Sequence, residues 1–524
     1  MKKEFRAVKF LSDGFKEELT KAASPYQGNV YPIITTLQAL ATPPLNCKTV
    51  VFEREYVDLD YRDEYAAFYS RAFKKYPARS VRLHFFAADL SDTDINVIDK
   101  FAEHYLGFLI LRPTDLQRVG RTILKPVLTN PDNEFIHCSA EFTAHIFGHK
   151  LIVNGMPFIQ QDTQVGACAQ AALWMLARYM SRRFGHREFL PAEINQFAKA
   201  KGAMGRALPA EFGLDWRQML DALEGMGFSA WSHSRQELDD CSQHIDSAFP
   251  AEQKAGKQKK EKHKQFVRVV KLAGIAYRYI ESGLPVIFGT RDHALVGIGH
   301  TYDHAVSVKV AIQRIPAFIV HNDAAGPYQK MPIFPPAAAG QRHFSEVEDI
   351  IAVVPLAVTL RGEEAESMSR QAVARFLNLP TGDAQYPTYK DLIYHVRADF
   401  VGLLECLEYR TFLMPSVEFQ AKLRHDVKDN RFDSALADRL IGLDYPKFLW
   451  ITEVSSSTLL NHPHRRERRC LGRILIDSTA PSRTRGEMVV HFADFLGMLD
   501  RQTGEPKKWG YLPNSTPFGH QISR

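Results

Sequence analysis

A single cysteine, Cys168, stands where a polar segment gives way to an apolar one in the run 157–175. After it, Ala172, Met175 and Tyr179 recur at the spacing of one helical face, which predicts an amphipathic helix whose first turn begins at the cysteine. A thiol at a helix N-terminus faces unpaired N–H groups and the positive end of the helix dipole, and both favour the thiolate. The position therefore suits a nucleophile, although an isolated cysteine is more often simply buried in a core.

Two glutamines, Gln161 and Gln164, precede this cysteine in the polar segment. A side-chain amide close to a nucleophile can donate to the oxyanion that develops on an attacked carbonyl, together with the backbone N–H of Cys168. Glutamine is common in polar loops, so a catalytic role for either glutamine needs support from residues further along the chain.

A histidine follows at the start of a predicted strand. Residues 283–288 indicate a turn and a strand, and residues 293–298 indicate a second strand. His293 therefore begins the second strand, where its side chain can reach a neighbouring helix end. A histidine at a strand edge is more often structural than catalytic, and the strands around this one make it the better candidate for a general base.

A third polar group ends the next apolar strand. Residues 317–320 predict that strand, and Asn322 and Asp323 follow it ahead of a Gly/Pro turn. A carboxylate or amide at this point can accept a hydrogen bond from an imidazole N–H and fix its tautomer. Asn and Asp are also ordinary turn residues, so the case rests on the three features occurring in this order.

That order resembles the one found in papain-like cysteine peptidases, most closely in their C39-like branch, which processes bacteriocins. The likeness is carried by QVGACAQAALWM, GLPVIFGTRDHALVGIG and HNDAAG, within residues 155–335. It implies that Cys168 is the nucleophile, His293 its base and Asp323 the third member of a triad. Asn322 is the neighbour of that third member, and no metal or cofactor is expected.

The chain departs from the family pattern next to the nucleophile. The family has glycine after its cysteine and glutamine six residues before it, where this chain has Ala169 and Asp162. A one-residue insertion would make Gln161 the oxyanion donor, with Gln164 as the alternative. Residues 214–231 resemble the family's second helix and following strand. The cysteine-to-histidine separation is close to the roughly 130 residues of papain-type enzymes.

A chain of 524 residues suggests about three domains, and the alternating helical and strand patterns predict the α+β class. We expect an N-terminal α+β domain at 1–150 and a C-terminal α+β domain at 341–524, both of unknown role. Between them, residues 151–340 would form the papain-like unit, with a helical half and an antiparallel β half. A lysine-rich insertion at 251–265 would be a solvated loop or helix face.

The composition of the chain indicates the class of protein and its cellular location. The 45% hydrophobic and 24% charged residues are ordinary for a globular protein. Six cysteines without close pairs, no apolar signal sequence and no stretch approaching about 18 apolar residues favour a cytoplasmic protein without a membrane span. The net charge of +6 is modest, and nucleic-acid binding is the less favoured reading even of the basic loop at 461–473.

Two groups of histidines were the remaining metal candidates. His137, His145 and His149 lie near one another in sequence, and His300 and His304 form an HxxxH pair. Neither group has the fixed spacing and helical setting of a known metal motif, so we expect no metal site in either.

The sequence thus predicts a cysteine peptidase that hydrolyses a peptide or isopeptide bond through a thioester intermediate. Two alternatives stay open: an acyltransferase or deamidase that uses the same triad, and a catalytically silent binding module. A peptide or protein is the expected substrate, and the flanking domains could bind a regulatory protein. Sequence alone does not define the substrate, the cleavage preference or the oligomeric state.

Overall fold

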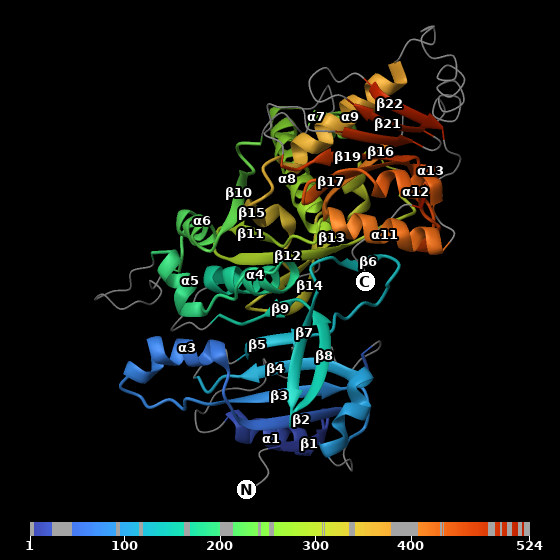
Figure 1. Ribbon diagram of the computed structural model, residues 1–524. Coiled ribbons are helices and arrows are strands. Elements are labelled where there is room, and N and C mark those ends of the chain that lie inside the picture. Colours follow the sequence, from blue (N-terminus) through green and yellow to red (C-terminus); the bar gives the residue numbers. More distant parts are fainter. Residues whose placement is uncertain are drawn as a thin grey trace.

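The structure is a computed structural model of the chain. It describes residues 5–23, 45–90, 95–114, 119–161, 168–199, 213–238, 243–250, 256–306, 308, 310–334, 341–378, 407–429, 432, 434–479, 488–492, 495–499, 506–511 and 516–517. Within these residues, most strands belong to three large antiparallel sheets, with helices packed between and around them. Figure 1 shows the three sheets following one another through the molecule from the blue N-terminal part to the red C-terminal part. This mixed architecture confirms the predicted α+β class.

The N-terminal sheet has the strand order β1-β2-β3-β4-β5-β9. Its strands are β1 (Phe5–Lys9), β2 (Thr49–Tyr56), β3 (Ser80–Phe86), β4 (Tyr105–Leu111), β5 (Val119–Leu124) and β9 (Pro157–Phe158). The helical elements of this part are α1 (Asp13–Ala23), α3 (Leu59–Ala67), and 3-10 turns at Tyr69–Arg71 and Ile95–His104. A two-stranded ribbon of β7 (Ala140–Ile146) and β8 (His149–Gly155) packs between this sheet and the next unit.

The central sheet has the order β10-β15-β11-β12-β13-β14, and β6 pairs with β12 beside that path. Its strands are β6 (Glu134–Ile136), β10 (Phe228–Ser234), β11 (Val286–Thr290), β12 (Ala294–Thr301), β13 (Ala317–Asn322), β14 (Gly326–Pro332) and β15 (Val347–Pro355). β11 to β13 are buried almost throughout, as their apolar sequences require. Short 3-10 turns occur at Ala311–Arg314 and Phe344–Glu346.

Two long helices hold this sheet. α4 (Cys168–Phe184) is buried on all sides from its second residue to Ser181, not only along the face that the spacing indicated, because it lies between the central sheet and the N-terminal part (Figure 1). α8 (Lys257–Glu281) packs on the other side against β12 and β15. The lysine-rich run from 257 onward is therefore the exposed first part of a helix, and residues 251–255 lie outside the described part.

Smaller helices complete the central unit: α5 (Pro191–Phe197), α6 (Trp216–Gly225) and α7 (Gln243–Ala248). α6 begins with a capping box in which Asp215 and Gln218 each accept a backbone N–H from the other's residue, so its start is set locally. α8 ends at Glu281, and Gly283 then takes φ 67°, the left-handed conformation that closes helices and turns the chain into β11.

The C-terminal sheet has the order β16-β17-β19-β20-β21-β22. Its strands are β16 (Leu407–Pro415), β17 (Phe448–Ser456), β19 (Gly472–Asp477), β20 (Met488–Phe492), β21 (Phe495–Leu499) and β22 (Pro506–Tyr511), with a separate β18 (Arg469–Cys470) and β23 (Thr516–Pro517) pair. Its helices are α9 (Gly362–Asn378), α11 (Ser416–Lys428), α12 (Ser434–Ile441), α13 (Ser457–Leu460) and a 3-10 turn at Arg465–Glu467.

The two faces of this sheet pack against different hydrophobic cores, because successive side chains of a strand point to opposite faces. Leu413 and Trp450 belong to the main hydrophobic core, whereas Phe412 and Ile451 belong to a second core with α11 and α12. The main core is continuous from Val8 in β1 through the central sheet to the C-terminal sheet. The three parts of the chain are therefore packed on one another and not joined only by linkers.

The central sheet crosses both of the boundaries that the sequence suggested. β6 comes from before residue 150 yet pairs with β12, and β15 comes from after residue 340 yet lies between β10 and β11. Only the pairing partners of these two strands reveal which sheet they complete.

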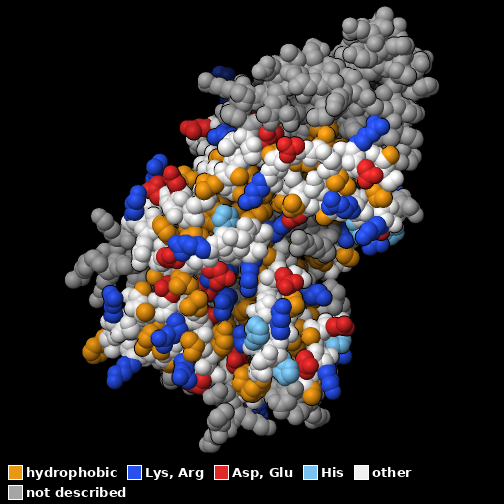
Figure 2. All heavy atoms as spheres, viewed as in Figure 1, with side chains coloured by type: hydrophobic (Ala, Val, Ile, Leu, Met, Phe, Trp, Pro, Cys, Tyr) orange, Lys and Arg blue, Asp and Glu red, His pale blue; other side chains and the backbone are white. Residues whose placement is uncertain are grey.

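The described residues contain no helix of the length and hydropathy that a membrane crossing requires. On the face seen in Figure 2, lysine and arginine side chains are interspersed with aspartate and glutamate. Part of the basic loop at 461–473 is also committed to internal contacts. Arg468 is fully buried and donates to the side chain of Asn133 and to the carbonyl oxygen of His462. This charge is used to pack the loop onto the central unit.

Candidate functional site

Cys168 is the first residue of α4, as the sequence predicted. It is half-buried, whereas Cys47, Cys138 and Cys470 are buried, and all four are free thiols. The helix is fixed behind it, because α4 packs on β12 and the Tyr179 hydroxyl donates to the Gly283 carbonyl oxygen at 2.7 Å. The thiol is thus placed at the N-terminal end of a helix that is otherwise held in place, where backbone N–H groups have no helical partner.

His293 lies in the tight connection between β11 and β12, directly before β12 begins. Its carbonyl oxygen accepts hydrogen bonds from the backbone N–H and the hydroxyl of Thr290, at 2.8 and 3.1 Å, and these close the turn. The Cys168 side chain is close enough to the imidazole ring to raise the pKa of the ring. Two residues far apart in sequence therefore meet at one end of the central sheet.

Asn322 and Asp323 both contact the Nε2 atom of the His293 ring. His293 Nε2 is 3.0 Å from Asn322 Oδ1, in a hydrogen bond, and 3.0 Å from Asp323 Oδ1, in an ion pair. Neighbouring residues of a strand point to opposite faces. β13 ends at Asn322, however, and the chain turns at Asp323, which lets both side chains face the same ring. With Nε2 engaged by these two acceptors, Nδ1 is the nitrogen left for the thiol.

The carboxylate of Asp323 is almost fully buried, at 1% exposure. Among the described residues its oxygens accept no hydrogen bond of good geometry, so the His293 ring is the cation that compensates their burial. Asn322 is held separately, because its Oδ1 also accepts the Ala324 backbone N–H at 3.0 Å. A buried carboxylate facing one imidazole is the arrangement that stabilises an imidazolium.

The pKa of His293 records this environment. Burial of the ring lowers its pKa, but the nearby Asp323 carboxylate and Cys168 side chain both favour the charged ring and more than offset that cost. The pKa of His293 is raised from 6.5 to about 10. At neutral pH the ring therefore carries a proton and a positive charge on the side of the sheet where Cys168 lies.

The oxyanion donor predicted from the sequence is not settled by the geometry. Gln161 is half-buried in the segment after β9, and no contact between it and Cys168 or His293 is present in the described part of the chain. The start of this segment is anchored, since Gln160 exchanges hydrogen bonds with the Val119 backbone. The alternative, Gln164, lies outside the described residues. The backbone N–H of Cys168 remains available as one donor because it begins the helix.

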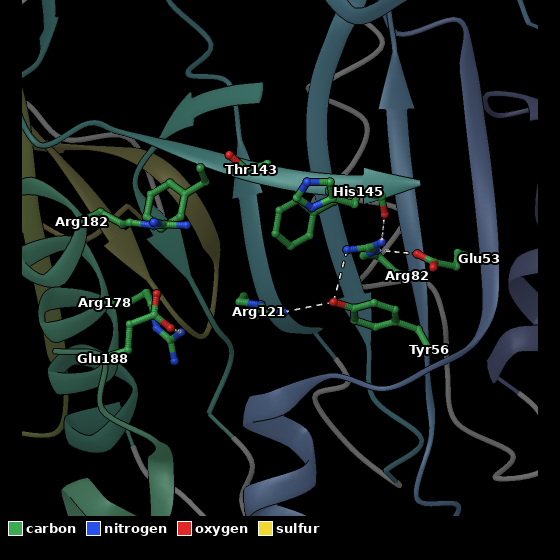
Figure 3. Close-up of a pocket in the computed structure, with 11 residues that line it drawn as sticks. Glu53, Tyr56, Arg82, Arg121, Thr143, His145, Arg178, Arg182 and Glu188 are labelled. Atoms are coloured by element: carbon green, nitrogen blue, oxygen red, sulfur yellow. Dashed lines mark hydrogen bonds and ion pairs between the residues drawn. The ribbon is translucent and has the colours of Figure 1, made fainter. Parts of the chain in front are cut away.

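A cavity of about 340 Å³ lies at the opposite end of α4, between that helix and the N-terminal sheet. Arg182 of this cavity is about 21 Å along the helix axis from Cys168, at 1.5 Å per residue, so the cavity is separate from the cysteine site. Figure 3 shows Arg82 and Arg121 both directed at the Tyr56 hydroxyl, at 3.2 and 3.3 Å, below the ribbon strand that carries His145.

Most of the charge in this cavity is balanced locally. Arg82 contacts Glu53 at 2.5 Å, Arg121 contacts Asp58 at 2.7 Å, and Arg178 contacts Asp60 at 2.6 Å. Arg182, whose guanidinium lies 5.6 Å from the Phe142 ring centroid, has no carboxylate within ion-pair distance among the described residues. The cavity therefore joins the N-terminal sheet to α4 and presents one exposed cation.

The structure also assembles a cluster that the sequence did not indicate. His137 and His300, one from each histidine group, meet Glu281 in the interior. The other histidines go elsewhere, because His145 lines the arginine cavity and His149 lies 3.6 Å from Asp99. Residues this far apart in sequence carry no common motif, and only the pairing of β6 with β12 brings the two histidines together.

No protein-family model, curated protein or solved structure matches the chain.

Proposed function

We propose that this protein is a cysteine peptidase that cleaves a peptide or isopeptide bond, with Cys168 as nucleophile and His293 as acid and base. Its catalytic unit would have a papain-like arrangement, with the helix that carries the cysteine packed on a sheet that carries the histidine. The proposal rests on one observation: the Cys168 side chain is close enough to His293 to raise the pKa of the ring, while Nε2 of that ring lies 3.0 Å from Asp323 Oδ1.

In the proposed reaction, the Cys168 thiolate attacks the substrate carbonyl carbon, and the negative charge moves to the carbonyl oxygen. Protonated His293 then gives its proton to the leaving amine, and a thioester forms as the C–N bond breaks. Neutral His293 next takes a proton from water, which attacks the thioester. The carboxylic acid leaves, and the thiolate–imidazolium pair is restored. Every proton transfer in this cycle passes through one imidazole.

Asp323 and Asn322 would act on that imidazole and not on the substrate. Their shared contact with Nε2 fixes the ring, so that Nδ1 faces the sulfur in each step. The buried carboxylate of Asp323 favours the charged ring, and the amide of Asn322 adds a neutral acceptor held in place by its own turn. Both are positioning residues in this proposal.

Labelling with iodoacetamide at pH 6 tests the proposal. An unactivated thiol is almost wholly protonated there and reacts slowly, so rapid modification of Cys168 would mark a thiolate. The chain contains internal controls, because burial raises the pKa of Cys47 to about 12 and raises that of Cys138 as well. His293→Gln should slow the labelling of Cys168 and leave the other cysteines unchanged. A Cys168 that reacts no faster than a free thiol would contradict the proposal.

The fate of the acyl group separates hydrolysis from the alternatives. Incubation with a mixture of peptides of varied sequence, followed by mass spectrometry, should reveal new N-termini that are absent with Cys168→Ala. Ligated peptides or conversion of glutamine to glutamate would instead identify an acyltransferase or a deamidase with the same triad. A reactive Cys168 with no product of any kind would favour a binding module.

The sheets on either side of the central unit are consistent with a protein substrate. Both flanking sheets pack on the central unit through one continuous core, so they are placed to recognise a substrate or a regulatory protein beside it. A cytoplasmic location, which the sequence predicts, would keep the four described free thiols reduced.

A further inference from the structure

The buried cluster of His137, Glu281 and His300 lies well inside the molecule, on a different part of β12 from the residues that flank His293. His137 directly follows β6, His300 lies in β12, and Glu281 ends α8. The three side chains are 2%, 0% and 1% exposed. We propose that they bind a Zn²⁺ ion that ties β6, α8 and β12 together.

Strand register explains why the two histidines meet. Phe135 of β6 pairs with His300 of β12, and the backbone N–H of His137 donates to the Ile298 carbonyl oxygen. His137 and His300 are therefore diagonal neighbours on the same face of the sheet, within reach of each other. α8 packs on β12 and delivers Glu281 to the same point.

The distances match a tetrahedral site. The two Nε2 atoms are 3.1 Å apart, His300 Nε2 is 2.8 Å from Glu281 Oε1, and His137 Nε2 is 3.7 Å from Glu281 Oε2. Ligands bound to zinc at about 2.0–2.2 Å in a tetrahedron are separated by about 3.3–3.6 Å. The three observed separations include values below and above this ligand–ligand distance. An ion would therefore fit among the three groups after small side-chain movements.

The hydrogen-bonding capacity of the cluster favours a cation in the middle. His300 Nδ1 lies 3.0 Å from the Thr301 carbonyl oxygen, which can only accept, so the proton of a neutral ring is assigned to Nδ1. Its Nε2 then has a bare lone pair that lies 2.8 Å from Glu281 Oε1, which is also an acceptor. Facing acceptors repel one another unless a cation lies between them. A metal ion satisfies all three, and the rival is an extra proton on His300.

The surrounding residues have the character of an outer ligand shell. Arg410 of β16 donates to Glu281 Oε2 at 3.0 Å, and Tyr277, one turn earlier on α8, lies near the same carboxylate. Such contacts orient a metal-binding carboxylate. A water or the Tyr277 hydroxyl would supply the fourth ligand. The three side chains are almost completely shielded from solvent. The bound ion would therefore have a structural role, as in other fully buried zinc sites.

Metal analysis of the full-length chain tests this inference. After dialysis and incubation with Zn²⁺, the wild type should retain about one equivalent per chain, whereas His137→Gln and His300→Gln should lose it. The matched control is His84→Gln. His84 is equally buried and also contacts a carboxylate, Glu53 at 3.2 Å, but within the described part of the chain it belongs to no cluster of three possible metal ligands. This variant should keep the metal. Cys168→Ala should keep it as well, which makes the result independent of the proposed peptidase activity.

A second measurement guards against variants that fail to fold. The chelator-treated wild type should take up Co²⁺ with the intense visible absorption of a tetrahedral site, and Zn²⁺ should displace it. Thermal unfolding should shift to higher temperature on Zn²⁺ addition, since a ligand of the native state stabilises it. Failure of the wild type to bind either ion would overturn the inference. So would nitrogen NMR showing His300 protonated at both ring nitrogens and unchanged by Zn²⁺.

Discussion

His293 and Asp323 face each other at the end of the central sheet, with Nε2 of the ring 3.0 Å from Oδ1 of the carboxylate. The carboxylate is buried and the ring is nearly so, at 9% exposure, which strengthens their attraction over that of a surface pair. The pair connects the turn after β13 to the turn before β12. It thereby holds the imidazole against Cys168, and the proposed chemistry depends on it.

Separate substitutions should rank the two acceptors on His293. Asp323→Asn removes the buried charge that favours the imidazolium, and we expect peptide cleavage to slow by about 10²-fold to 10⁴-fold, the contribution of a positioned acid–base group. Asn322→Ala removes one neutral hydrogen bond and should cost about tenfold or less. Steady-state kinetics measure both. A larger loss in Asn322→Ala than in Asp323→Asn would mean that Asn322, and not Asp323, is the third member of the triad.

The raised pKa of His293 predicts the alkaline limit of activity. Because the leaving amine needs a proton from the ring, cleavage should persist through neutral pH and fall as pH rises through about 10. In Asp323→Asn this fall should begin at lower pH, since the carboxylate charge that raises the pKa of the ring is gone. A pH–rate profile of each protein is the measurement. Identical alkaline limbs would count against control of the ring by Asp323.

The same pKa shift predicts how stability changes with pH. A group whose pKa is higher in the folded state stabilises fully below its unfolded pKa, here 6.5, and the contribution is lost as pH rises through the folded value of about 10. Urea unfolding of the wild type should therefore show a loss of stability between these two pH values that is smaller in His293→Gln. If the free energy of unfolding changes equally with pH in the two proteins, the prediction is wrong.

A fragment of residues 155–340 should not fold. It lacks β15, which pairs with both β10 and β11 in the middle of the central sheet, and it lacks β6. Unpaired strands with apolar faces aggregate. We expect the fragment to be insoluble and inactive when it is expressed alone, and co-expression of residues 341–524 to restore part of the soluble protein. A soluble, active fragment would show that the central sheet forms without β15.

Gly299→Ala should destabilise the protein strongly. A Cβ at this position would lie 2.1 Å from the Phe135 carbonyl oxygen, so β6 could not stay paired with β12. The expected loss in free energy of unfolding is about 3 kcal/mol, the upper end for overpacking. Gly14→Ala in α1 is the control, because its Cβ would meet only the Ser12 hydroxyl at 3.7 Å. A stable Gly299→Ala protein would mean that β6 can be displaced at little cost.

The sequence alone determined the local features of the site. Apolar spacing after Cys168 and the change from polar to apolar residues predicted where α4 begins, because helix periodicity and capping are set by neighbours in the chain. The strand before Asn322 and the strand after His293 followed from short apolar runs in the same way. These patterns named three side chains and their order, without showing that they meet.

Tertiary structure decided which distant segments are neighbours. β15 and β6 join the central sheet across both expected boundaries, and their sequences carry no mark of the partner strand, since any short apolar strand can pair with any other. The meeting of His137 with His300 follows from that pairing alone. Sequence periodicity reports which face of an element is apolar, whereas strand register and helix packing bring distant side chains into contact.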